Sequence, residues 1–166
     1  MGEAKIGDEF ITHEFDEAIA IQQVIVDAET QLSTRHPFAS AKRAIRSSLE
    51  DDRTYLSELK ALGKEHDATG KVEDVAGGLK ELMEETLSTA TADGADSDFY
   101  EAHAVLLNLK RKQMDSAGGM LAIARDQKDT KLRDAASAFQ KAQKASCEAL
   151  TTELADYAVK IAGAAA

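Results

Sequence analysis

Apolar residues recur at intervals of three and four along four long stretches of this 166-residue chain, and no other feature constrains the fold as strongly. Such spacing keeps side chains on one face of an α-helix. The chain has a single proline and only 5% aromatic residues, while alanine, leucine, glutamate and lysine are abundant. Sheet-forming residues are too few for a β fold, so pattern and composition together predict an all-α protein. The first stretch shows the pattern in Ile11, Phe15, Ala18, Gln22, Ile25, Glu29 and Leu32.

The breaks between these stretches predict where the helices begin and end. His36-Pro37 ends the first helix, because the residue before a proline avoids the α region and proline favours a helix's first turn. TADGADSD at residues 91–98 reads as a loop, with Asp98 and Glu101 as a capping pair, and Asp129 is predicted to be an N-cap. The expected helices span residues 8–34, 38–65, 71–90, 98–126 and 129–162.

The segment 71–90 differs from the other predicted helices, because it is shorter and Gly77-Gly78 weakens its middle. It is expected to be a crossover helix that joins two long hairpins. Two hairpins linked in this way give an antiparallel four-helix bundle with a short crossover helix between its second and third members. The length fits a single domain over residues 1–166.

Four uncharged polar residues lie on the predicted inward faces of the long helices: Gln22, Ser48, Gln113 and Gln143. At a rise of about 1.5 Å per residue, Gln22 and Ser48 are equally far from the first turn, as Gln113 and Gln143 are from the second. An unpartnered buried amide costs on the order of 1–3 kcal/mol, so these side chains are expected to bond to one another. The favoured interpretation is an uncharged layer that fixes helix register. A remnant of a metal site, or a small cavity that holds water, is the alternative.

The charge and the termini exclude several functions. A formal net charge of −10 repels nucleic acid and anionic lipid, so neither partner is expected. MGEAKIGDEF at the start does not resemble a secretory signal, and no run approaches the roughly 20 apolar residues that span a bilayer, so a cytoplasmic location is expected. Cys147 is expected to be a small inert hydrophobe. Lys110-Arg111-Lys112 is expected to lie on a solvated helix face, with a docking patch as the second interpretation.

The four histidines were considered as metal ligands, because imidazole is a common ligand. His13 shares a helix face with Glu17, although such pairs are more often exposed than metal-bound. His36 and His66 are predicted at helix ends, where a cation suits the helix dipole. His103 is expected to be half-buried or to reach the interior. No phosphate-binding loop, nucleophile elbow or paired-cysteine motif is present, so hydrolase chemistry has no support.

Three short acidic motifs resemble those of ferritin-like proteins, especially the YciF-like group of small bacterial stress proteins. The motifs are DAETQL at residues 27–32, SLEDD at 48–52 and DFYE at 98–101. The likeness covers most of the chain in layout and only these few residues in identity. It implies a ferritin-like antiparallel four-helix bundle and a stress-related role.

The resemblance also implies a di-iron or di-manganese centre, with a glutamate from each of two helices and a Glu-x-x-His pair from each of the other two. Carried over residue by residue, it places Glu29, Asp51 or Asp52, and Glu101 in acidic positions. The sequence has no Glu-x-x-His pair, and Gln143 stands where the last helix would carry an acid. Counted from the first turn, Glu29 and Asp52 lie about three turns apart in depth, which predicts that they do not meet at one ion.

The sequence therefore predicts a ferritin-like bundle with a structural, stress-related or protein-interaction role, no cofactor, and no clear sign of an enzyme. One alternative is an iron- or manganese-binding oxidase or storage protein with an unconventional site, built from Glu29, Asp52, Glu101 and His103. The other is a carrier of a small apolar ligand, for which Met114 and Met120 offer an adaptable lining. A homo-oligomer, in its simplest form a dimer, is expected because long bundles often leave an apolar stripe uncovered.

Overall fold

The computed structural model describes residues 2–90 and 96–164, and the side chains of residues 7–90 and 97–163. Within this part the protein has no strands, so the predicted all-α class is confirmed. The long helices are α1 (Gly2–Arg35), α2 (Ala39–Gly63), α4 (Asp96–Gln127) and α5 (Thr130–Ala164). The shorter elements are α3 (Leu79–Thr89) and the 3₁₀ helices η1 (Lys64–His66) and η2 (Val75–Gly78).

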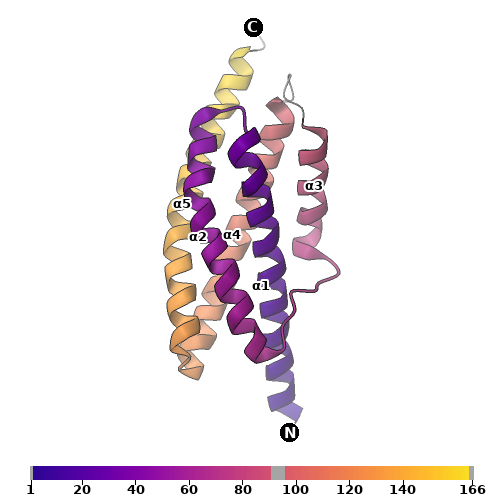
Figure 1. Ribbon diagram of the computed structural model, residues 1–166, viewed down its shortest axis with the longest axis vertical. Coiled ribbons are helices and arrows are strands. Elements are labelled where there is room, and N and C mark those ends of the chain that lie inside the picture. Colours follow the sequence, from indigo (N-terminus) through magenta and orange to yellow (C-terminus); the bar gives the residue numbers. More distant parts are fainter. Residues whose placement is uncertain (1, 91–95, 165–166) are drawn as a thin grey trace.

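The long helices run side by side in two antiparallel pairs. Figure 1 shows α1 and α5 running toward the end of the molecule where the C-terminus lies, while α2 and α4 run the other way. α1 packs against α2 and α4 against α5, and the two pairs meet where α2 contacts α5 and α1 contacts α4. α3 lies along the outside of this arrangement and packs mainly on α4.

Several predicted helix ends are confirmed. α1 ends at Arg35 and α2 begins at Ala39, so the chain turns at His36-Pro37 as expected. Asp129 is the N-cap of α5, because its Oδ1 accepts a hydrogen bond from the backbone N of Leu132 at 3.0 Å. The capping role predicted for Asp98 is wrong, because α4 already begins at Asp96. The rest of the predicted loop, residues 91–95, lies outside the described residues.

The predicted helix over residues 71–90 is wrong in its first half. Ala76, Gly77 and Gly78 all have positive φ angles, of 55°, 63° and 86°. Left-handed residues cannot continue a right-handed helix, and glycine adopts this conformation at little cost. α3 therefore begins only at Leu79, after the η2 turn.

Two polar contacts tie this crossover to α1. The backbone N atoms of Thr69 and Gly70 donate to Asp16 Oδ1 at 2.7 and 2.9 Å. At the other end, Arg35 Nη2 donates to the carbonyl oxygens of Leu87 and Ala90 at 2.8 and 3.1 Å. The last carbonyls of α3, which have no partner inside the helix, are thereby satisfied.

The core consists of two apolar clusters. One lies toward the α1–α2 turn and contains Ile25, Leu106 and Leu150, and the other lies toward the opposite end and contains Phe15, Leu59 and Phe139. Along α4 and α5, a buried polar stretch falls between the two clusters in sequence, and on α1 the buried Gln22 and Glu29 lie among residues of the first cluster. This polar stretch positions the candidate site.

The described surface bears on the predicted membrane and oligomer properties. No helix in the described part is both long and apolar enough to cross a membrane. Its exposed large apolar side chains are Phe10, Leu82 and Val159, which lie on α1, α3 and α5. They do not form one stripe, so the dimer stays a prediction without an apolar face assigned to it.

Candidate functional site

Residues from all four long helices meet in a buried cluster at the middle of the protein. We call it the polar cluster, and each of its members is at most 8% exposed. Its members share an inward-facing position and a polar side chain. They are Gln22 and Glu29 of α1, Ser48 and Asp52 of α2, Lys110 and Gln113 of α4, and Gln143 of α5.

The ammonium of Lys110 lies at the centre of the polar cluster. Its Nζ is 2.8 Å from Asp52 Oδ2 and 3.3 Å from Glu29 Oε2, and it donates to Ser48 Oγ at 3.4 Å. Ser48 Oγ also donates to Glu29 Oε2. Lys110 and Glu29 are 0% exposed, so this ion pair is shielded from water.

The three amide side chains are organised around Asp52. Gln22 Nε2 donates to Asp52 Oδ1 at 3.1 Å and to the Asp52 carbonyl oxygen at 2.9 Å. Gln143 Nε2 donates to the same Oδ1 at 2.7 Å. Gln113 Nε2 donates to Gln22 Oε1 at 3.1 Å and to the Ala18 carbonyl oxygen at 2.7 Å. Both Asp52 carboxylate oxygens therefore receive charged or amide donors.

The charges of the cluster balance internally. Burial, and then Asp52, raise the pKa of Glu29 well above its usual value, against the opposing effect of Lys110. Burial raises the pKa of Asp52, but hydrogen bonding from Glu29 and the charge of Lys110 outweigh it and lower that pKa overall. Burial lowers the pKa of Lys110, but the two nearby carboxyl groups raise it by more, so this pKa is higher than usual overall. The lysine charge is thus matched to Asp52, whose ionised form is favoured, while the acid form is favoured at Glu29.

The sequence identified part of this cluster. The structure places Gln22, Ser48, Gln113 and Gln143 in the interior and brings them together. The layer is not uncharged as expected, however, because Lys110 and Asp52 form its centre. The solvated position predicted for Lys110 is wrong, and only Arg111 and Lys112 of that basic run are exposed. Helical spacing could have found Lys110, since it lies four residues after Leu106 and three before Gln113 on the buried face of α4.

The expected separation of Glu29 and Asp52 is also wrong. Both carboxyl groups lie within 3.3 Å of the same nitrogen. Helical side chains lean toward the N-terminus of their own helix. In an antiparallel pair, Glu29 therefore leans away from the α1–α2 turn and Asp52 leans toward it, which closes much of the difference in depth.

The four metal candidates do not form one site. Glu101 is exposed on α4. His103 is buried and uses both ring nitrogens in contacts to His36 and to the Leu150 carbonyl. Glu29 and Asp52 do meet, but a lysine ammonium occupies the position between them where a metal would need to bind. These residues therefore do not fit the dinuclear centre that the resemblance implies.

His36 and His103 instead form a buried hydrogen-bonded chain. The backbone N of Phe38 donates to His36 Nδ1 at 3.0 Å, which leaves His36 Nε2 to donate to His103 Nδ1 at 3.1 Å. His103 Nε2 then donates to the Leu150 carbonyl at 2.9 Å. Both rings are therefore neutral with defined tautomers. The cationic role predicted for His36 is wrong, because burial and then the neighbouring His103 lower the pKa of His36 to about 3.

His13, Glu14 and Glu17 form the one group of possible metal ligands found among the described residues, with ligand atoms within 4.8 Å of one another. All three lie on the surface of α1, and His13 is exposed. Glu17 already lies 3.7 Å from His13 and 3.6 Å from Lys112, so its carboxylate is partly neutralised. The helix face that the sequence predicts for His13 and Glu17 is present, but it is separate from the polar cluster.

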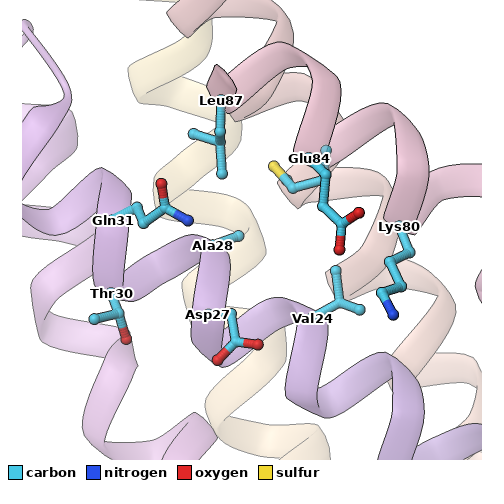
Figure 2. Close-up of a pocket in the computed structure, with 9 residues that line it drawn as sticks. Val24, Asp27, Ala28, Thr30, Gln31, Lys80, Glu84 and Leu87 are labelled. Carbon is cyan, nitrogen blue, oxygen red and sulfur yellow. The ribbon is translucent and has the colours of Figure 1, made fainter. Parts of the chain in front are cut away.

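A cavity of about 350 Å³ lies between α1 and α3. Figure 2 shows Val24 and Ala28 of α1 and Leu87 of α3, together with the charged side chains of Asp27, Lys80 and Glu84. The cavity thus has a lining that is partly apolar and partly charged. It is not the interior pocket expected for a carrier, because neither Met114 nor Met120 lines it.

Comparison with known protein families, curated proteins and solved structures finds no match to this chain.

Proposed function

We propose that this chain is a ferritin-like antiparallel four-helix bundle that works as a non-catalytic structural or protein-interaction component, with a stress-related role. The paired long helices with opposite directions and the crossover element α3 support the architecture. The motif likeness supports the ferritin-like relationship. Homo-oligomer formation, in its simplest form a dimer, belongs to the same proposal, and sedimentation analysis of the purified protein would measure it.

One observation carries the non-catalytic role: Lys110 Nζ lies 2.8 Å from Asp52 and 3.3 Å from Glu29 in a shielded interior. Its positive charge compensates the two buried carboxyl groups on either side of it. A divalent ion at this position would have to displace the ammonium and would receive few anionic ligands, although hard cations need several oxygen ligands. The lysine therefore takes the place that a metal would hold in a catalytic bundle.

Metal titration tests this proposal. The protein is purified without chelator, analysed for bound elements and titrated with ferrous iron. We expect far less than one ion per chain, whereas about two tightly bound ions per chain would favour the oxidase or storage alternative. Lys110→Glu is the informative variant, because it exchanges the ammonium for a third carboxylate and should increase iron affinity. Unchanged affinity in a folded Lys110→Glu protein would show that Lys110 does not keep metal out.

The cavity between α1 and α3 favours a second candidate, a carrier of a small, partly apolar molecule. A volume of about 350 Å³ falls within the usual range of ligand pockets. Native mass spectrometry of freshly purified protein would reveal a co-purified molecule, and Ala28→Phe, which places a larger side chain in the lining, should abolish its retention. Equal retention by this variant would exclude the cavity as the binding site.

A further inference from the structure

The polar cluster has the parts required for an acyl-transfer reaction within the chain. The amine nitrogen of Lys110 lies 2.8 Å from Asp52 Oδ2, and both side chains are at most 2% exposed. Burial fixes the two groups beside each other, which converts an otherwise bimolecular reaction into an intramolecular one. The contacts of Nζ to Glu29 and Ser48 are longer, at 3.3 and 3.4 Å, so Asp52 is its nearest partner.

The other carboxyl oxygen of Asp52 has the donors that such a reaction needs. Gln22 Nε2 and Gln143 Nε2 donate to Oδ1 at 3.1 and 2.7 Å, so two fixed N–H groups face the oxygen on which negative charge would develop. Paired donors at such distances stabilise tetrahedral intermediates in acyl transfer. Glu29 borders Nζ on the other side at 3.3 Å, and its raised pKa favours the acid form that can donate a proton.

We propose that Lys110 and Asp52 condense to an amide that covalently joins α4 to α2. Lys110 Nζ first gives a proton to Asp52 Oδ2 along their hydrogen bond. The resulting amine attacks Asp52 Cγ, and the electron pair moves onto Oδ1. Glu29 then protonates the departing Oδ2 hydroxyl and takes a second proton from the nitrogen. One C–N bond forms, one C–O bond breaks, one water molecule leaves, and Glu29 ends as it began.

The product is free of the buried charges of the ion pair. The pKa directions of Lys110 and Asp52 favour ionisation and oppose the first proton transfer, which makes that transfer the slow step. In water, ionisation stabilises a free amine and a free acid, but here both charges bear the cost of burial, which a neutral amide does not. The released water also has a place beside Asp52. A cavity of about 10 Å³, close to the volume one water needs, is lined by Ser48, Asp52, Gln143 and Ser146. The Oγ of Ser146 and the Oε1 of Gln143 are buried without a hydrogen-bond partner in the described structure.

A second cavity lies beside the first. Its volume is about 80 Å³, it lies along the α2–α5 contact, and it shares Asp51, Phe139 and Ala142 with the first. Asp51 is exposed, so this side of the polar cluster is the one nearest to solvent-exposed lining.

Intact-mass spectrometry of the denatured full-length protein tests the proposal. After incubation of the folded protein at neutral pH, we expect a mass lower by one water molecule than the unmodified chain. Peptide mapping should then yield a branched peptide that joins the segments around Asp52 and Lys110. On a denaturing gel, the closed loop between these residues should make the chain migrate faster than an unlinked one.

Two variants separate this reaction from other causes of mass change. Lys110→Arg keeps a buried cation but removes the nucleophilic amine, and Glu29→Gln keeps the shape of the acid but removes its proton. Both should show the full mass, while Lys112→Arg, altered at an exposed position, should still lose water. An unmodified wild-type mass after prolonged incubation, or the same water loss in folded Lys110→Arg, would overturn the proposal. The linkage would consume the Lys110 ammonium, so the metal titration and the Lys110→Met comparison apply to the unlinked protein, which its full mass identifies.

Discussion

At the scale of single residues, Lys110 is the least expected side chain in the interior, because lysine is almost never fully buried unless it is paired. Here two carboxyl groups and a hydroxyl surround its ammonium. A buried ion pair of this kind adds little to stability compared with apolar residues of the same shape, but its partners depend on each other strongly. Removing one partner leaves the other charge buried and uncompensated.

We therefore expect Lys110→Met to lower the free energy of unfolding by about 3–5 kcal/mol, measured by urea denaturation. Asp52 would then be buried without its cation. Adding Asp52→Asn to this variant should recover most of the loss, because the site becomes neutral again. Lys112→Met is the matched control, since the Lys112 side chain is 45% exposed and pairs only with Glu17 in the described structure. It should cost less than about 1 kcal/mol, and equal losses in the two single variants would refute this account.

The limits of sequence reasoning are clearest at this scale. The positions of Gln22 and Gln143 followed from helical spacing, because both fall on the apolar face of their helices. Lys110 and His103 lie on the same face of α4. The residue type of Lys110 suggested a solvated surface, and His103 was expected to be half-buried or to reach the interior. Their partners are distant in sequence, and only the packing of α4 against α1, α2 and α5 brings them within bonding distance.

At the scale of helices, local signals account for most of the observed boundaries. The proline after His36 and the N-cap Asp129 act within a few residues, so the sequence was sufficient to predict them. The start of α3 was not predictable in the same way. Its position depends on left-handed angles at Ala76 and Gly77, which are compatible with the sequence but not required by it.

The cap of α5 gives a direct test at this scale. Asp129→Ala removes the acceptor for the backbone N of Leu132, so we expect the free energy of unfolding to fall by about 1 kcal/mol. Asp126→Ala is the control, because Asp126 is an exposed acid at the C-terminal end of α4, where a negative charge is unfavourable. It should leave stability unchanged or raise it slightly. Thermal and urea unfolding, followed by helical circular dichroism, would measure both.

At the scale of the whole molecule, two buried groups make stability depend on pH in opposite directions. The folded-state pKa of His36 lies below its ordinary value of 6.5, so unfolding takes up a proton and stability falls as the pH drops below 6.5. The folded-state pKa of Glu29 lies above its ordinary value of 4.5, so unfolding releases a proton and stability falls as the pH rises above 4.5. Between these values the two effects oppose each other.

We expect urea unfolding to show this opposition. Replacing His36 by Phe should remove the His36 part of the acid sensitivity, so that the free energy of unfolding relative to wild type rises by about 2 kcal/mol between pH 7 and pH 5. The part due to His103, whose pKa burial also lowers, should remain. His36→Phe also loses a buried hydrogen bond, which lowers stability equally at both pH values. Glu29→Gln should remove the opposite effect, so that its free energy of unfolding relative to wild type rises as the pH increases. His13→Gln, at an exposed position, is the control, and a parallel shift of all profiles would contradict the assignment.

The histidine chain also makes one backbone amide a reporter on the entire protein. The N–H of Phe38 lies in a turn, where amides normally exchange with solvent in seconds, yet it donates to His36, whose ring in turn contacts α4. Its proton can exchange freely only when that ring moves. Slow deuterium uptake at this single amide would therefore record how rarely the first hairpin separates from the second.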